Sequence, residues 1–227
     1  MDLRHIEAII FDAEGVVVNT EKLWDESQEI LLGKRGLIYD REYLKPRMAG
    51  QTLLEGAELM VSYYGLDVSP EDMAYERQVI IDQLFDGPIP FIDGFESFVH
   101  WISASNLKKG IATAMNRNLM LKVEDQLNLK RYFREHIYFI EDVGNKSKPE
   151  PDVFLHAADK LEVNPQRCLV IEDAPHGIEA AKSAGMVSIG IVTTFTKEHL
   201  LHADFTGRDF DEIKMFLISS GINNTSI

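Results

Sequence analysis

The chain has 227 residues, of which 45% are hydrophobic and 26% are charged, a composition typical of a folded globular protein. Its formal net charge of -14 argues against nucleic-acid binding through phosphate contacts, and no local basic patch offsets that charge. This length permits one large domain, or one domain that carries a smaller inserted one.

No apolar run approaches the roughly 18 residues of a membrane span. The amino terminus lacks the basic and apolar segments of a signal peptide, so we expect a cytoplasmic protein without a membrane partner. The single cysteine, Cys168, lies in an apolar run and is predicted to be a buried structural thiol. The sequence does not reveal the oligomeric state, and a monomer is the default expectation.

The apolar, β-branched run from Ile6 to Phe11 predicts a buried strand, which ends in Asp12, Glu14 and Gly15. Residues two apart in an extended chain point the same way, so the two carboxylates are expected to face one spot. Ligands bind at the carboxyl ends of strands in open α/β sheets. A strand followed by an acidic turn without a function fits this stretch as well.

Residues 21–85 carry helix signals and no strand pattern. We predict four helices there, over residues 21–34, 41–45, 53–64 and 70–85. Thr20 is the expected cap of the first helix, and Pro46 is expected to end the second. Thr52 and Glu55 have the spacing of a capping box. Residues 86–94 are rich in Pro and Gly and form the predicted return linker.

From Phe95 onward, predicted strands and helices alternate, which indicates a parallel sheet with helices on both faces. Strands are predicted over residues 109–114, 137–140, 168–171 and 187–192. Helices are predicted over residues 95–105, 117–127, 152–161, 177–184 and 211–218. Residues 222–227 are expected to form a frayed tail. The predicted fold class is α/β, a Rossmann-like parallel-sheet core with an inserted all-helical domain.

Polar residues gather at or beyond the carboxyl ends of the predicted strands, which share one edge of a parallel sheet. They are Asp12, Glu14, Thr113, Lys148, Glu172 and Asp173. Clustered carboxylates repel one another, which suggests a bound cation, and hard oxygen ligands beside a phosphate point to Mg²⁺. Phosphoryl transfer needs a nucleophile, a proton donor and positive charge, and this set contains candidates for each.

Four stretches resemble, in the same order, the four motifs of the haloacid dehalogenase superfamily. They are Asp12-x-Glu14-Gly15-Val16, the strand-terminal Thr113, Lys148-Pro149-x-Pro151-Asp152-x-Phe154 and Glu172-Asp173-x-x-x-Gly177-Ile178-x-Ala180-Ala181. The helical block resembles the small cap of the phosphatase and β-phosphoglucomutase-like branch, and the resemblance covers nearly the whole chain. It implies a catalytic core of residues 1–17 and 90–227 and a helical cap of residues 18–89.

The resemblance implies a Mg²⁺-dependent phosphatase that hydrolyses a small phosphorylated metabolite, such as a sugar or nucleoside phosphate. Asp12 would be the nucleophile that forms an aspartyl-phosphate. Glu14 would be the general acid/base, and its main-chain carbonyl would also bind the metal. Glu172 and Asp173 would complete the metal site with Asp12.

The same resemblance implies the residues that hold the phosphoryl group. Thr113 would hydrogen-bond its oxygens, helped by main-chain N–H groups of the next turn, which begins at Ala114. Lys148 would neutralise both the nucleophile and the phosphate. A lone threonine at the end of a strand, or a lone lysine, is usually an ordinary surface or capping group, and only the joint pattern suggests these roles.

The sequence departs from the family pattern at several positions. Glu14 stands where the family usually has aspartate, although the branch that resembles enolase-phosphatases also carries Asp-x-Glu-Gly. Asn19 replaces an aspartate that is common in the family at that spacing from the nucleophile. Trp24 stands where β-phosphoglucomutases have a histidine, and Leu53 stands where they have an arginine if Gly50 is the matching glycine. These differences argue against a phosphoglucomutase-like isomerase, which is kept as an alternative to the phosphatase. A second alternative is a binding protein that keeps the fold but has weakened catalysis.

Five other polar residues invite a functional interpretation. Lys45, Arg47, Gln51 and Arg117 lie where a substrate contact is possible, but we interpret them as surface groups because exposure is the default for such residues. His176 follows the acidic pair, and we interpret it as a packing residue.

Overall fold

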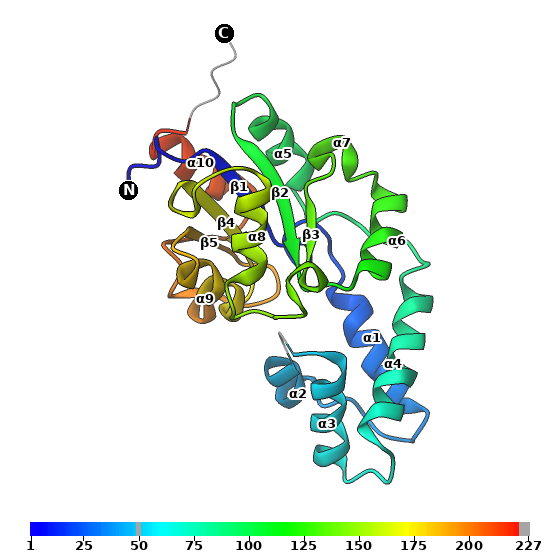
Figure 1. Ribbon diagram of the computed structural model, residues 1–227. Helices are drawn as coiled ribbons and strands as arrows, with labels where there is room; N and C mark the ends of the chain where they lie inside the picture. Colours follow the sequence, from blue (N-terminus) through cyan, green and yellow to red (C-terminus); the bar gives the residue numbers. More distant parts are fainter. Residues whose placement is uncertain (49–50, 223–227) are drawn as a thin grey trace. The chain divides into compact units, whose positions relative to one another are not determined.

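The computed structural model describes residues 1–48 and 51–222 and contains a six-stranded parallel sheet with helices on both faces (Figure 1). The strand order is β3-β2-β1-β4-β5-β6, and every neighbouring pair is parallel. The strands are β1 (Ala8–Phe11), β2 (Lys108–Thr113), β3 (Ile137–Phe139), β4 (Cys168–Glu172), β5 (Val187–Ile191) and β6 (Phe205–Gly207). The predicted α/β class with a parallel sheet is confirmed.

The helices fall into two sets. Those before residue 90 are α1 (Glu21–Gly33), α2 (Arg41–Met48), α3 (Leu53–Tyr64) and α4 (Pro70–Leu84). Those that alternate with the strands are α5 (Phe95–Ser103), α6 (Arg117–Leu127), α7 (Lys130–Phe133), α8 (Asp152–Lys160), α9 (Pro175–Ser183) and α10 (Phe210–Ser219). Short 3-10 turns are η1 (Ile140–Val143), η2 (Pro165–Arg167) and η3 (Lys197–Leu200). In the part of the chain that the structure describes, no helix is long and apolar enough to cross a membrane.

The central strand β1 is fully buried and packs on both of its faces. Ala8 and Ile10 join an apolar cluster with side chains of α8 and α9. Phe11 points to the opposite face, where its ring meets Phe95 and Phe98 of α5 edge to face. Burial on both faces explains why the sequence of this strand is continuously apolar instead of alternating.

The chain forms two compact units. One comprises residues 1–19 and the segment from Pro90 onward, and the other is the insert Thr20–Ile89. Within the first unit, the segments just before and just after the insert lie side by side. Val18 pairs antiparallel with Phe91, and the Asn19 N–H donates to the Pro90 carbonyl at 2.9 Å. The assignment of these parts as a catalytic core and a cap stays a prediction.

The insert has an apolar core of its own. Its buried members come from all four helices and are Leu31, Leu32, Leu44, Met48, Ala57, Met60, Met73 and Ile80. The predicted capping box of α3 is present, since the Thr52 hydroxyl accepts the Glu55 N–H at 3.2 Å and the Glu55 carboxylate accepts the Thr52 N–H at 2.7 Å. Two predictions in this unit are wrong.

Pro46 does not end the second helix but lies inside α2, which continues through Met48. A proline there removes one helical hydrogen bond, and burial of Met48 in the core of the insert offsets that loss. Thr20 stands before α1 but makes no side-chain capping bond. Its φ of -98° and ψ of -2° are helical, whereas a capping residue is extended.

The remaining differences concern short or terminal segments. Helix α9 begins at Pro175, two residues before the predicted start. The sequence did not predict α7 and β6, because four and three residues are too few to show a period. Ile222 is buried and not frayed. Gly50 and residues 223–227 of the predicted tail lie outside the described residues.

Candidate active site

The carboxyl ends of β1, β2 and β4 meet at one edge of the sheet, and the predicted site residues follow them. Phe11 is level with Ile111 on one side and with Ile171 on the other. Asp12, the next residue, donates its N–H to the Ile171 carbonyl at 3.0 Å. This register places Asp12 beside Glu172 at the end of β4. The sheet therefore brings together residues that lie far apart in the sequence.

Lys148 joins two of these carboxylates from the segment that precedes α8. Its Nζ lies 2.6 Å from Asp12 Oδ1 and 2.7 Å from Glu172 Oε1, and its side chain is 2% exposed. Burial alone would lower the pKa of the Lys148 ammonium, but the charges of Asp12 and Glu172 and their hydrogen bonds raise it above its ordinary value. The lysine is therefore a fixed positive charge in contact with the predicted nucleophile.

Three buried carboxylates, those of Asp12, Glu172 and Asp173, offer oxygens that all lie within 4.8 Å of one another. Burial raises the pKa of Asp12 to about 7 against the influence of Lys148. Burial and the charges of Glu172 and Asp12 also raise the pKa of Asp173 well above its ordinary value. Burial opposes ionisation of Glu172 too, but Lys148 holds the pKa of that carboxyl below its usual range. The cluster is short of positive charge, and its oxygens can hold a metal ion.

Two glycines allow these carboxylates to lie against the main chain. A Cβ at Gly177 in α9 would lie 1.8 Å from Glu172 Oε1, which is impossible without movement. A Cβ at Gly15 would lie 1.9 Å from Asp173 Oδ2, and Gly15 also has a φ of +71°, which disfavours other residues. Both glycines belong to the motifs identified in the sequence, and their role is to leave room for the acidic side chains.

Glu14 lies in the turn that follows Asp12. It is half-buried, and its main chain forms a bridge with Val18, whose carbonyl accepts the Gly15 N–H at 2.9 Å. The pKa of Asp12 is raised mainly by burial, with smaller contributions from the charges of Glu172 and Glu14. The charge of Glu14 thus acts on Asp12, and the expectation that the two carboxylates face one spot stays a prediction.

Thr113 ends β2 as a fully buried residue, and its hydroxyl accepts the Met115 N–H at 3.0 Å. The next residue, Ala114, is exposed. Asn116 then caps α6, as predicted, by accepting the Leu119 N–H at 2.9 Å. Thr113 and Ala114 therefore lie between the end of β2 and the cap of α6.

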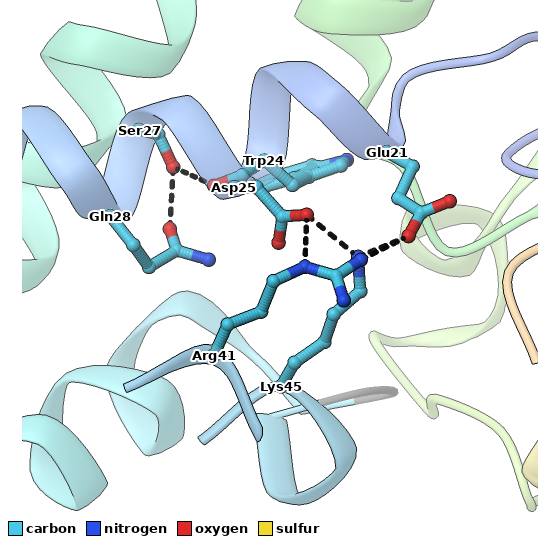
Figure 2. Close-up of polar contacts among 7 residues, drawn as sticks. All are labelled: Glu21, Trp24, Asp25, Ser27, Gln28, Arg41 and Lys45. Carbon is cyan, nitrogen blue, oxygen red and sulfur yellow. Dashed lines mark hydrogen bonds and ion pairs between the residues drawn. The ribbon is translucent and has the colours of Figure 1, made fainter. Parts of the chain in front are cut away.

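Lys45 belongs to a charged network inside the insert (Figure 2). Its Nζ lies 2.5 Å from Glu21 and 2.9 Å from Asp25, and Arg41 pairs with the same two carboxylates at 2.8 Å and 2.9 Å. This arrangement balances two positive with two negative charges and links α2 to α1. Gln51 is exposed. The contacts of Lys45 fit a structural role.

Two other arginines also have partners within their own unit. Arg117 pairs with Asp142 at 2.5 Å and lies over the Phe139 ring at 4.0 Å. Arg47 lies over the Tyr43 ring at 3.9 Å and donates to the Tyr43 carbonyl. These contacts favour the interpretation of both residues as surface groups.

Trp24 and His176 both lie in packed surroundings. The Trp24 ring meets the buried Phe85 ring edge to face, with centroids 6.1 Å apart. His176 lies in the first turn of α9, and burial lowers the pKa of its imidazole despite the nearby charge of Glu172. A histidine with these surroundings is neutral near pH 7.

Two residues that follow β5, Thr193 and Thr194, lie at this edge and were not predicted. The Thr193 hydroxyl donates to the Gly15 carbonyl at 2.6 Å, and the Thr194 hydroxyl and the Asp173 carboxyl both lie against Gly15. Both threonines stand just past the carboxyl end of a predicted strand, which is the signal that identified Thr113. Thr193 and Thr194 thus belong to the same sheet edge as the predicted site.

Comparison with known proteins agrees with this geometry. Residues 6–185 match the model of the haloacid dehalogenase-like hydrolase family. Two relatives from Arabidopsis thaliana are (DL)-glycerol-3-phosphatases 1 and 2, 32% and 33% identical over 80% of this chain. The matched region spans 62% of the first, a mitochondrial protein, and 77% of the second.

A bacterial relative is the fructose-1-phosphate phosphatase of Escherichia coli, 29% identical over 81% of this chain and 95% of that protein. Among solved structures, the β-phosphoglucomutase of Clostridium difficile is 27% identical and superposes with a TM-score of 0.73, covering 94% of this chain and 96% of that one. The family model alone covers well over half of the sequence. We conclude that the chain is an enzyme of the haloacid dehalogenase-like hydrolase family.

Proposed function

We propose that this protein is a Mg²⁺-dependent phosphatase that hydrolyses a small phosphate monoester through an aspartyl-phosphate on Asp12. The observation that carries the proposal is the contact of Lys148 with both Asp12 and Glu172 at the sheet edge where three buried carboxylates converge. A buried carboxylate beside a fixed ammonium is suited to attack a phosphorus atom, because the ammonium offsets the repulsion between two anions.

In the first step, an Asp12 carboxylate oxygen attacks the phosphorus, and the bond from phosphorus to the ester oxygen breaks. Glu14 donates a proton to the departing oxygen, which leaves as an alcohol. Thr113 and the main-chain N–H of Ala114 hold the non-bridging oxygens, and Lys148 stabilises their charge. The phosphoryl group is then covalently attached to Asp12.

In the second step, a water molecule attacks the phosphorus while Glu14 accepts its proton. The bond from phosphorus to the Asp12 oxygen breaks, which releases inorganic phosphate and restores the carboxylate. Glu14 is again protonated and ready to act as an acid. This exchange requires a carboxyl group that moves a proton in both directions, a task that glutamate performs with a side chain one methylene longer than aspartate.

The metal-binding residues in this proposal are Asp12, Glu172, Asp173 and the main-chain carbonyl of Glu14. Their donors are all oxygens, and burial together with the neighbouring carboxylate charges raises the pKa values of Asp12 and Asp173. Both properties fit Mg²⁺, which prefers hard oxygen ligands. When bound, Mg²⁺ neutralises negative charge on the phosphoryl group and the surrounding carboxylates.

In this proposal the insert is the cap. Residues 1–17 and 90–227 form the catalytic core, and residues 18–89 form the cap. Support comes from its position in the chain directly after Asp12 and Glu14, and from its separate apolar core. A cap that excludes water during the first step favours transfer to Asp12 over side reactions. The insert would also select the alcohol part of the substrate.

The substrate class in this proposal is a small polyol or sugar phosphate. The relatives named above act on glycerol 3-phosphate and fructose 1-phosphate according to their names. Nucleoside phosphates form a second class to test. A screen should therefore begin with these compounds, with Mg²⁺ present, and should measure free phosphate.

The decisive test compares the wild type with Asp12→Asn, with and without Mg²⁺. We expect phosphate release only from the wild type, and only in the presence of the metal. Equal rates for the two proteins would contradict the proposal and would favour a binding protein that has kept the fold.

An isomerase is the second candidate, because a β-phosphoglucomutase is among the similar structures. The packing of Trp24 against Phe85, at a position where the mutases carry histidine, argues against it. Conversion of β-glucose 1-phosphate to glucose 6-phosphate without phosphate release would decide in favour of the isomerase.

A further inference from the structure

Phe154 belongs to the lysine motif of the sequence but has no part in the proposed chemistry. It lies in α8, and its side chain is fully buried in an apolar cluster that also contains Ala112 and Val170. Lys148 Nζ lies over the Phe154 ring, 4.8 Å from the ring centroid. This distance is within the range of a cation–π interaction, in which the negative face of an aromatic ring attracts an ammonium.

The short segment between the two residues folds so that the ring reaches the ammonium. The Glu150 N–H donates to the Ser147 carbonyl at 3.0 Å, which closes a turn that contains Lys148. The Phe154 N–H then donates to the Pro151 carbonyl at 3.1 Å, where α8 begins. A turn followed directly by a helix thus brings the two side chains together.

Two carboxylates and one neutral ring are partners of the Lys148 ammonium. Its Nζ donates to Asp12 Oδ1 at 2.6 Å and to Glu172 Oε1 at 2.7 Å, which uses two of its three N–H groups. The Phe154 ring is held among apolar side chains, where attraction to a cation is stronger than at an exposed site. Because the stem of a lysine is flexible, each of these contacts restrains the position of the charge.

The ring differs from the carboxylates in how its attraction changes during the reaction. In the proposed first step, an Asp12 oxygen forms a bond to phosphorus, and the negative charge of that carboxylate is lost. The attraction between Asp12 and Lys148 therefore weakens as the bond forms, whereas the attraction of the Phe154 ring stays the same. The ring still holds the ammonium at the stage where Asp12 no longer does.

We propose that Phe154 is a positioning residue that holds the Lys148 ammonium in place while the phosphoryl group is attached to Asp12. This inference rests on the proposed function, since it assigns a support to the lysine of the proposed reaction. Loss of the cation–π interaction should lower kcat with little effect on KM, because the buried ring acts on the reaction only through Lys148.

The test replaces Phe154 with phenylalanines that carry one, two or three ring fluorines. Each fluorine withdraws electron density from the ring face and weakens its attraction to a cation, while the shape of the ring hardly changes. With para-nitrophenyl phosphate and Mg²⁺, we expect kcat to fall with each added fluorine, reaching about 3- to 30-fold below the wild type with three. KM should change by less than about twofold.

The matched control is the same series at Phe210, a buried ring that packs against the rings of Phe95 and Phe98. Fluorines at this position should leave kcat unchanged. Phe154→Leu, which removes the ring but keeps an apolar side chain, should lower kcat at least as far as three fluorines do. Urea unfolding shows whether each variant is folded.

A folded protein whose kcat is the same with and without fluorines at Phe154 would overturn this inference alone. An equal fall of kcat in the Phe154 and Phe210 series would also overturn it, because the effect would then not depend on the ammonium. A wild type that releases no phosphate from any ester would overturn the proposed phosphatase together with this inference.

Discussion

Lys148 Nζ lies 2.6 Å from Asp12 Oδ1, although the two residues are 136 positions apart in the chain. The same nitrogen donates to Glu172 Oε1 at 2.7 Å, so one ammonium links the ends of β1 and β4. A buried charge that is paired in this way is costly to leave unpaired. The pair therefore matters for stability as well as for the proposed reaction.

Lys148→Met should weaken both properties. We expect the free energy of unfolding to fall by about 3–5 kcal/mol, because Asp12 and Glu172 lose their buried counter-ion. Phosphate release should fall by at least about 100-fold, since the methionine cannot stabilise the transferring group. Urea unfolding and a phosphate assay measure the two effects. Lys146→Met is the control, because Lys146 pairs with Asp152 in solvent, and equal losses in both variants would contradict the prediction.

Gly177→Ala should destabilise the protein, although alanine in a helix usually stabilises relative to glycine. The new Cβ would lie 1.8 Å from Glu172 Oε1 and would displace that carboxylate from Lys148. We expect the free energy of unfolding to fall by about 1–3 kcal/mol. Gly33→Ala is the matched control, because nothing lies within 4 Å of its new Cβ and the change should be neutral or slightly stabilising. A Gly177→Ala protein as stable as Gly33→Ala would show that Glu172 moves at no cost.

Glu14→Gln should impair turnover by about 100- to 10,000-fold, the usual contribution of a general acid/base. Its Mg²⁺ affinity should change little, because the proposed metal contact of this residue is its main-chain carbonyl. Steady-state kinetics and metal titration separate the two effects. Glu14→Asp, which keeps the acid, should retain more activity than Glu14→Gln. Unchanged turnover in Glu14→Gln would show that another group donates the proton.

The Cys168 thiol should resist modification in the folded protein. It is fully buried in β4, and burial raises its pKa to about 11, so the reactive thiolate is scarce at neutral pH. Labelling with a thiol reagent should proceed at the rate of unfolding and should become rapid in denaturant. Ser183→Cys places a second thiol at an exposed helix end and provides the control. Rapid labelling of the native wild type would contradict the predicted burial.

Local signals predicted the fold well where hydrogen bonds form within a few residues. Thr52 with Glu55 and Asn116 with Leu119 make the caps that their spacing predicts, and the helices that follow them begin where expected. The local rule that a proline ends a helix was wrong at Pro46, because packing of distant side chains holds the helix that contains it. Neighbouring residues determine the hydrogen bonds of a cap, whereas the ends of a short helix depend on tertiary packing as well.

The convergence of the site residues could be predicted from the sheet topology and not from local hydrogen bonds. Asp12, Thr113 and Glu172 each end a strand, and a parallel sheet places those ends together without any further information. The bond from the Thr193 hydroxyl to the Gly15 carbonyl depends on a side-chain contact across the sheet edge, which strand order alone does not determine. Lys148 lies on no strand, and its contact with Asp12 followed only from the family resemblance, whereas its contact with Glu172 was not predicted. The roles of these residues stay predictions until the variants are measured.

The position of β1 in the sheet sets the order in which the protein can fold during synthesis. This strand is made first, yet Ala8 pairs with Lys108 on one side and with Cys168 on the other. Most of the chain must therefore leave the ribosome before the apolar run Ile9-Ile10-Phe11 has both of its neighbours. The insert is continuous in sequence and can fold during that interval. Asp12, the proposed nucleophile, thus follows a segment that waits for both of its neighbours, and such a segment is exposed to aggregation before the sheet is complete.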